Sequence, residues 1–200
     1  MEEKELNTEE RIIQAAEKIL LKEGYAGARM QQIADEAQIN KAMLHYYYKS
    51  KEKLMEKIFS KKFNEFIPKV AEVIQSGATF EVVLRYYIDN YLDLLEKNPY
   101  LPLFLIDTMH RNPEFINQIP ELPGKVFVAG IEQQIAQHKL PPIKPYHLLL
   151  NIIGLCVFPV LARPIFKKVF QLTDEEYQII LKERKEEVYH FILDAVKNRE

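Results

Sequence analysis

Several residue types are scarce in this 200-residue sequence, and each scarcity excludes a class of protein. The chain has no tryptophan, only six glycines and a single cysteine, Cys156. One cysteine excludes an intrachain disulfide and any multi-cysteine metal site, and it fits a reducing compartment. So few glycines leave little room for a phosphate-cradling loop or for a sheet turned by glycine.

Long apolar runs are missing too. The longest, Leu148 to Ala162, is shorter than the roughly 20 residues that a membrane-spanning helix needs, and polar or helix-breaking residues interrupt it. The first residues, Met1 to Glu5, lead into no apolar segment, so we expect no signal peptide. These features predict a cytoplasmic protein with no membrane partner.

Enzyme chemistry finds no support in the sequence. The five histidines are scattered, and no His-Glu-x-x-His pair provides metal ligands on one helix face. Cys156 lies among Leu155, Val157 and Phe158, an apolar setting that does not activate a thiol. We therefore predict no catalytic residue, no metal site and no cofactor.

What the sequence does contain is helical periodicity. Asn7 with Glu10, and Thr173 with Glu176, form capping boxes that begin helices, while Asn40 is a good N-cap. Pro68 is expected to kink or end the helix that carries it. No stretch alternates with the period of a strand, so the predicted fold is all-α. The predicted helices span residues 8–23, 30–37, 41–48, 51 onward, 80–97, 102–111, 125–139, 146–169 and 174–197.

The first three predicted helices have the outline of a helix-turn-helix, since the second and third are joined by a three-residue turn. Geometry alone leaves open a small three-helix bundle with no DNA partner. The predicted organisation is a helix-turn-helix domain over residues 1–52 and a larger helical-bundle domain for ligand binding and dimerisation over residues 53–200.

Residues at many fixed offsets in this region resemble the signature of the TetR family of transcriptional regulators. They are Gly24-Tyr25, Ile33-Ala34-Asp35-Glu36-Ala37, Ile39-Asn40-Lys41, Leu44, Tyr47-Tyr48-Lys49-Ser50-Lys51 and Leu54. Three departures stand out: Gln38 replaces a turn glycine, Arg29 replaces a capping threonine or serine, and Tyr48 replaces a phenylalanine. Either Gln38 tolerates an unusual backbone conformation or the turn differs slightly from that of the family, and the Tyr48 hydroxyl needs a partner or solvent.

Lys41, Ala42 and Met43 begin the recognition helix and are the candidates to face base edges in the major groove. The resemblance implies phosphate contacts for His45, Tyr47 and Lys51, and Tyr46 could reach either base or backbone. The helix dipole favours a phosphate beside Arg29 and Gln31. Residues 38–62 hold seven lysines against two glutamates, which suggests a phosphate-facing surface. The predicted DNA-binding residues are Arg29, Gln31, Asn40, Lys41, Ala42, Met43, His45, Tyr46, Tyr47 and Lys51.

Selective DNA binding implies a homodimer, whose two recognition helices would lie about 34–36 Å apart on a palindromic operator. The resemblance places the interface on the last two long helices. Its predicted residues are Leu155, Phe158, Tyr177, Leu181, Arg184, Val188 and Ile192.

The resemblance also implies a pocket in the larger domain for a small apolar or aromatic effector that releases the DNA. Most of the aromatic side chains there could equally be core. The predicted pocket residues are Phe66, Tyr87, Tyr91, Phe104, Met109, Phe127, His147 and Asn151.

The function predicted from the sequence is a ligand-responsive transcriptional regulator, most simply a repressor. The alternative is a helical interaction protein, or a non-specific DNA-binding protein without operator selectivity.

Overall fold

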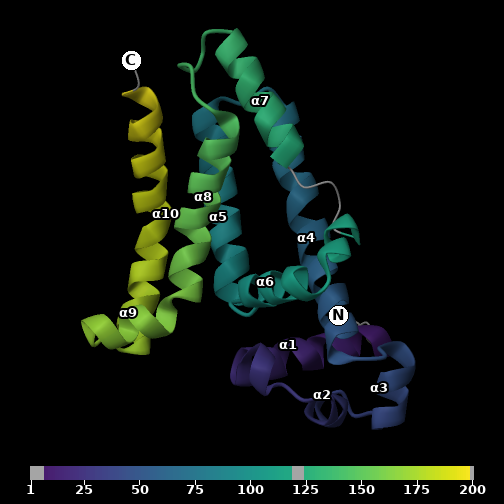
Figure 1. Cartoon of the computed structure of the whole chain (residues 1–200). Helices are drawn as coiled ribbons and strands as arrows, with labels where there is room; N and C mark the ends of the chain where they lie inside the picture. The colour runs from purple at the N-terminus through teal and green to yellow at the C-terminus, as the bar shows by residue number, and fades with distance from the viewer. Residues whose placement is uncertain (1–6, 119–123, 199–200) are drawn as a thin grey trace, which may run out of the picture. The chain divides into compact units, whose positions relative to one another are not determined.

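The computed structural model describes residues 7–118 and 124–198, and within these ranges every regular element is a helix (Figure 1). The all-α prediction is confirmed. The chain divides into two compact units, one of residues 1–62 with 98–118 and the other of residues 63–97 with 119–200. The long helix α4 contributes residues to both units.

The first unit contains the short N-terminal helices and one helix from the middle of the chain. Its elements are α1 (Thr8–Gly27), α2 (Met30–Glu36), α3 (Lys41–Tyr47), the first half of α4 (Lys51–Gln75), α6 (Leu101–Arg111) and the 3-10 helix η1 (Pro113–Gln118).

Helix α1 begins at the predicted capping box. Asn7 Oδ1 accepts a hydrogen bond from the Glu10 amide at 2.9 Å, and the Glu10 carboxylate accepts one from the Asn7 amide at 3.1 Å. The helix was predicted to end near Glu23. Gly24 does leave the helical region, with φ of 67°, but one more helical turn follows and ends at Gly27.

Helix α6 belongs to the core of the first unit, which the sequence did not indicate. The Phe104 ring lies 5.5 Å from that of Tyr25 and 6.0 Å from those of Phe59 and Phe115, measured between centroids. Phe104 is fully buried by these rings. A residue from the middle of the chain therefore completes the core around the N-terminal helices, while the domain boundary after residue 52 stays a prediction.

The second unit is built around long helices. Its elements are the second half of α4, α5 (Phe80–Lys97), α7 (Gly124–Ala136), α8 (Pro145–Leu161), α9 (Arg163–Phe170) and α10 (Asp174–Lys197). Helix α8 packs against α5, α7 and α10, and α10 also packs against α5. Helix α7 begins at Gly124, next to the predicted start at residue 125.

Two predicted helices differ from those in the structure. Helix α4 does not end at Pro68 but continues to Gln75; the proline is exposed, so the carbonyl that it leaves without a partner can be solvated. The single helix predicted over residues 146–169 is wrong: it breaks at Ala162 into α8 and α9, which are bent by 65°. Pro164 lies in the first turn of α9, where a missing amide proton costs nothing, so a new helix begins there.

Side chains of α10 donate hydrogen bonds to two backbone carbonyls of α8 near Pro159. Pro159 has no amide proton to give the Leu155 carbonyl, and Arg184 Nη2 donates to that oxygen at 2.9 Å. The Tyr177 hydroxyl donates to the Pro159 carbonyl at 2.7 Å. The C-terminal half of α8 is thereby bound to α10 by polar contacts as well as by packing.

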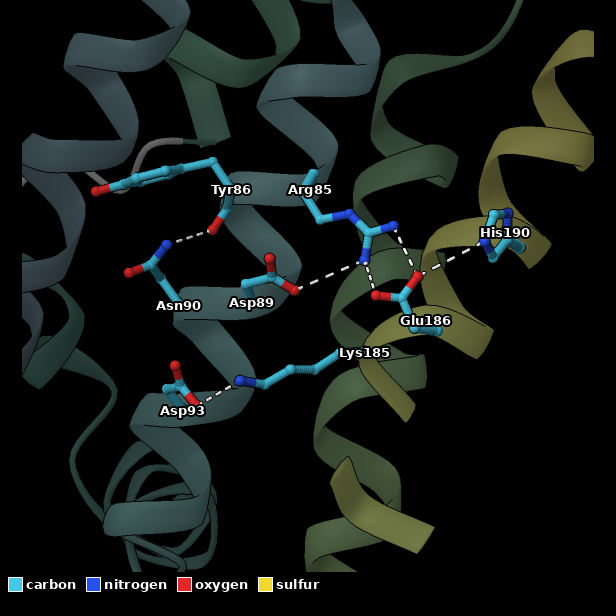
Figure 2. Close-up of polar contacts among 8 residues, drawn as sticks. All are labelled: Arg85, Tyr86, Asp89, Asn90, Asp93, Lys185, Glu186 and His190. Atoms are coloured by element: carbon cyan, nitrogen blue, oxygen red, sulfur yellow. Dashed lines mark hydrogen bonds and ion pairs between the residues drawn. The ribbon is translucent and has the colours of Figure 1, made fainter. Parts of the chain in front are cut away.

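Ion pairs join α10 to α5 (Figure 2). Arg85 forms a bidentate pair with Glu186, at 2.7 and 2.9 Å, and Lys185 lies 2.6 Å from Asp93. Such partly exposed pairs add little to stability; of the charged run of residues 182–187, they direct Lys185 and Glu186 toward α5.

No single helix of the described residues is both long and apolar enough to cross a membrane; α8 and α9 pass that test only as a bent pair.

Candidate nucleic-acid interface

Helix α3 is held in the first unit by two buried side chains. Leu44 is 0% exposed and Tyr48, the C-cap residue, is 7% exposed. The Tyr48 hydroxyl donates to Glu9 Oε1 at 3.1 Å, which supplies the partner that the sequence required. At the other end, Asn40 Oδ1 accepts from the Met43 amide at 2.7 Å, confirming the predicted N-cap. Both ends of α3 are thus fixed.

The turn before α3 has the conformation expected from the missing glycine. Gln38 adopts a left-handed φ of 56°. Arg11 of α1 stabilises this turn, because its Nη2 atom donates to the carbonyls of Ala37 at 2.6 Å and Gln38 at 3.3 Å. Sequence reasoning missed this role of Arg11.

The remaining side chains of α3 point outward. Six predicted DNA-binding residues of this helix are exposed: Lys41, Ala42, Met43, His45, Tyr46 and Tyr47. The rings of Tyr46 and Tyr47 meet edge to face with centroids 5.7 Å apart. The outward side of the helix therefore carries one cation at its N-terminus and two aromatic hydroxyls at its C-terminus, a set that can contact base edges and phosphates.

The start of α2 lies in the same unit and presents Arg29 and Gln31, both exposed. Arg29 is the N-cap residue, and its amide donates to Gln32 Oε1 at 2.9 Å. Gln32 thus provides half of a capping box where the usual threonine or serine is missing; the spacing of residues 29 and 32 carried this signal in the sequence. Gln31 Nε2 donates to Asp35 Oδ1 at 2.8 Å.

The lysine-rich segment is less available to DNA than its composition suggests, because several of its ammonium groups already have partners. The ion pairs are Lys53–Glu56 at 2.6 Å, Lys57–Glu9 at 3.1 Å and Lys62–Glu17 at 2.8 Å. The hydrogen bonds to Lys57 and Tyr48 also lower the pKa of Glu9. Lys51 bonds to backbone carbonyls, whereas Lys41 and Lys49 are exposed.

The predicted pocket residues do not form one group. Phe66, Tyr87, Tyr91 and Phe127 make an aromatic cluster in the second unit, with centroids 5.4–6.4 Å apart. Burial among them raises the pKa of Tyr87 and Tyr91. The other four lie elsewhere: Phe104 and Met109 in the first unit, and His147 and Asn151 exposed on α8.

The predicted interface residues are divided between interior and surface. Tyr177, Leu181, Val188 and Ile192 are buried in the second unit, where α10 packs against α5 and α8. Leu155 and Arg184 are half-buried, and Phe158 is exposed. The buried four cannot meet another chain in this arrangement, because their own unit already covers them.

The outward faces of α8, α9 and α10 carry large apolar side chains, of which the sequence reasoning singled out Phe158 alone. The exposed residues are Leu150, Phe158, Ile165, Val169, Phe170, Ile179, Ile180 and Phe191. Part of this face is a hollow of about 350 Å³ lined by Phe158, Phe166, Phe170, Ile180 and Arg184, among others. Patches of this kind mark interaction sites more often than free surface.

The described ranges form neither of two kinds of reactive site, a metal centre and a thiolate. No three His, Cys, Asp or Glu side chains there are arranged to hold a metal ion. Burial raises the pKa of the Cys156 thiol to about 12, so it is not a thiolate nucleophile at neutral pH.

Residues 12–58 match the family model described as "Bacterial regulatory proteins, tetR family". The matched segment runs from the middle of α1 into α4 and includes all of α2 and α3.

Two curated relatives cover part of the chain. It is 33% identical over 109 residues to the HTH-type transcriptional repressor NicS of Pseudomonas putida, and 30% identical over 84 residues to the fatty acid metabolism regulator protein of Bacillus subtilis. The alignments cover 54% and 42% of this chain, but only 45% and 43% of the respective relatives.

Likeness to solved structures extends over nearly the whole chain. The transcriptional regulator FadR of Bacillus subtilis, solved in complex with stearoyl-CoA, superimposes with a TM-score of 0.69 at 19% identity. The match covers 93% of this chain and 98% of FadR, and at this identity it shows that the two chains share a fold.

Proposed function

We propose that this chain, whose residues 12–58 match the tetR family model, is a regulator of that type that binds a palindromic operator as a homodimer and releases it when a small effector binds. The observation that carries this proposal is that α3 is held firmly in its unit while one of its faces stays exposed. The helix is fixed in its unit by the buried Leu44 and Tyr48 and by the Asn40 cap. The other six side chains of α3 are exposed. A helix fixed in this way can enter a major groove without reorganising.

In this proposal the N-terminus of α3 reads bases. Lys41 donates to guanine O6 or N7, and Ala42 and Met43 contact thymine methyl groups. Asn40 keeps its side-chain amide protons available, because its cap uses only the oxygen. His45, Tyr46 and Tyr47, with Arg29 and Gln31 of α2, hold the flanking phosphates and the register of the protein on the duplex.

The proposed dimer uses the outward apolar faces of α8 and α10 in place of the stripe that the sequence suggested. Phe158, Ile180 and Phe191 would be covered by a second copy, with Leu155 and Arg184 at the edge of the contact. Exposed aromatic side chains of this size supply the buried anchors that stable interfaces need.

The proposed effector is small and apolar or aromatic, and it binds in the second unit beside the cluster of Phe66, Tyr87, Tyr91 and Phe127. The effector must bind the state that cannot hold DNA more tightly than the other state, because equal affinity for both would shift nothing. The DNA partner places the protein in the cytoplasm, with no cofactor and with repression as the simplest outcome.

The test is a DNA-binding titration of the full chain. We expect fluorescence anisotropy to show binding to a labelled duplex from upstream of the protein's own gene at least about a thousandfold tighter than to scrambled duplex of equal length. Equal affinity for both duplexes would indicate a non-specific DNA-binding protein, and no binding to either would indicate a helical interaction protein.

A further inference from the structure

Lys51, the first residue of α4, has an unusual position for a cation. The N-terminus of a helix carries a partial positive charge, so a lysine there is electrostatically unfavourable unless something compensates. In this structure the compensation comes from within the unit. Lys51 Nζ donates to the Tyr25 carbonyl at 2.8 Å and to the Ala28 carbonyl at 3.2 Å, and it lies 4.5 Å from the centroid of the Tyr25 ring.

These carbonyls are available because of how α1 ends and α2 begins. In a continuous helix the Arg29 amide would bond to the Tyr25 carbonyl, but here it donates to Gln32 Oε1. The helix is already interrupted at Gly24. The connector between α1 and α2 thus presents backbone acceptors that need a donor, and buried or half-buried carbonyls are costly to leave unpaired.

The three contacts use most of what an ammonium group can offer. It has three N–H donors, of which two are directed at carbonyls, and the face of an aromatic ring attracts the same cation. The side chain is half-buried, whereas Lys49, two residues earlier, is exposed. A phosphate bound to Lys51 would have to share the ammonium group with the contacts that fix the chain just before Arg29.

We infer that Lys51 is a positioning residue: it holds the α1–α2 connector against the start of α4 and so places Arg29 and Gln31 for DNA, without contacting a phosphate itself. Since α4 follows α3 directly, this contact sets where the start of α2 lies relative to the recognition helix. The inference rests on the proposed DNA-binding function and changes one of its assignments, because the resemblance to the family implied a phosphate contact for this lysine.

Salt dependence separates the two roles. When a lysine contacts a phosphate, a counterion is released from the DNA. Loss of that lysine therefore makes the negative slope of log K against log salt concentration less steep by about 0.9. A positioning lysine changes the affinity but leaves that slope unchanged. We would measure the affinity of the full chain for its operator duplex at several salt concentrations, for wild type, Lys51→Met and the matched control Lys49→Met.

We expect Lys51→Met to bind about tenfold more weakly than wild type, the scale of a lost charge-assisted hydrogen bond, with the wild-type slope. Lys49→Met should lower the slope by about 0.9 if this exposed lysine faces a phosphate. If the salt slope of Lys51→Met became less steep by about 0.9, as expected when a phosphate contact is lost, the inference would be overturned. An unchanged affinity at a temperature where circular dichroism shows Lys51→Met to be folded would also overturn it, since the lysine would then serve stability alone.

Lys51→Arg provides a second variant that keeps the charge. Arginine binds phosphate at least as well as lysine, but its planar fork does not match a site shaped for a compact ammonium group. Weaker binding at an unchanged slope supports positioning, and affinity equal to or above wild type overturns it. Wild-type protein that binds no DNA at any salt concentration would overturn the proposed function and this inference together, whereas an altered slope in Lys51→Met alone overturns only the inference.

Discussion

The outward face of α3 and the outward face of α8 and α10 differ in a way that separates their roles. On α3 the side chains that fix the helix, Leu44 and Tyr48, are buried, and the exposed set mixes a lysine, a histidine and two tyrosines with Ala42 and Met43. On α8 and α10 the interior is equally apolar, yet Phe158 and Phe191 are still 59% and 64% exposed. The face of α3 carries polar groups that water solvates, whereas the face of α8 and α10 leaves large apolar side chains exposed that a further surface would cover. Such a contrast distinguishes a surface made for a polar partner from one made for protein.

The largest expected effect tests whether α3 depends on its own core. Leu44→Ala removes a fully buried side chain, and we expect the unit to lose roughly 2–5 kcal/mol of unfolding free energy together with operator binding. Urea unfolding followed by circular dichroism measures this. Met43→Ala, on the exposed side of the same helix, is the control and should change stability by less than about 0.5 kcal/mol. Similar losses in both variants would contradict the division of α3 into two faces.

The second effect concerns the apolar face. Phe158→Glu places a charge in the proposed contact, and we expect it to weaken self-association about a hundredfold, measured by sedimentation equilibrium. Val82→Glu alters an exposed apolar residue of α5 and should leave association unchanged. If the two variants associate equally, the proposed dimer surface is misplaced.

A smaller effect tests base reading. Lys41→Ala should reduce the ratio of operator to scrambled-duplex affinity about tenfold, because the lost contact is specific to a base. Lys61→Ala removes an exposed lysine of α4 and should preserve that ratio. Competition titrations at fixed salt concentration give both ratios, and an unaltered ratio for Lys41→Ala would remove this residue from the base-reading set.

The smallest effect is a pH dependence that arises where α1, α3 and α4 meet. The hydrogen bonds to Lys57 and Tyr48 lower the pKa of Glu9, so the contribution of this carboxylate to stability is present above pH 4.5 and is lost as the pH falls through its folded pKa. The side chain is 43% exposed, which reduces the contribution to a few tenths of a kcal/mol. The decrease in unfolding free energy from neutral to acidic pH should therefore be slightly smaller in Glu9→Gln than in wild type. A steeper acid loss in the variant would contradict this assignment.

Local features of the fold could be predicted from the sequence because their causes are local. The capping boxes at Asn7 and Thr173 and the N-cap at Asn40 are confirmed, since each depends on residues three positions apart. The left-handed Gln38 was expected on other grounds, because the family that the segment resembles usually has glycine at this position.

Features that depend on distant partners could not be predicted. The apolar stripe of Tyr177, Leu181 and Val188 was identified correctly as a stripe, but periodicity does not say whether its own chain or a second copy covers it. Likewise, nothing near Lys51 in the sequence indicates the Tyr25 and Ala28 carbonyls, which are more than twenty residues away.

The bond from Arg184 to the Leu155 carbonyl also limits how the second unit can rearrange. If α10 slid along α8 by one helical turn, the guanidinium would face carbonyls that already have helical partners, and the oxygen opposite Pro159 would lose its donor. This bond therefore favours the observed register over a slipped one by about 1–3 kcal/mol, the cost of leaving a partly buried carbonyl without a donor. Motion that keeps the bond is favoured to that extent over sliding between α8 and α10.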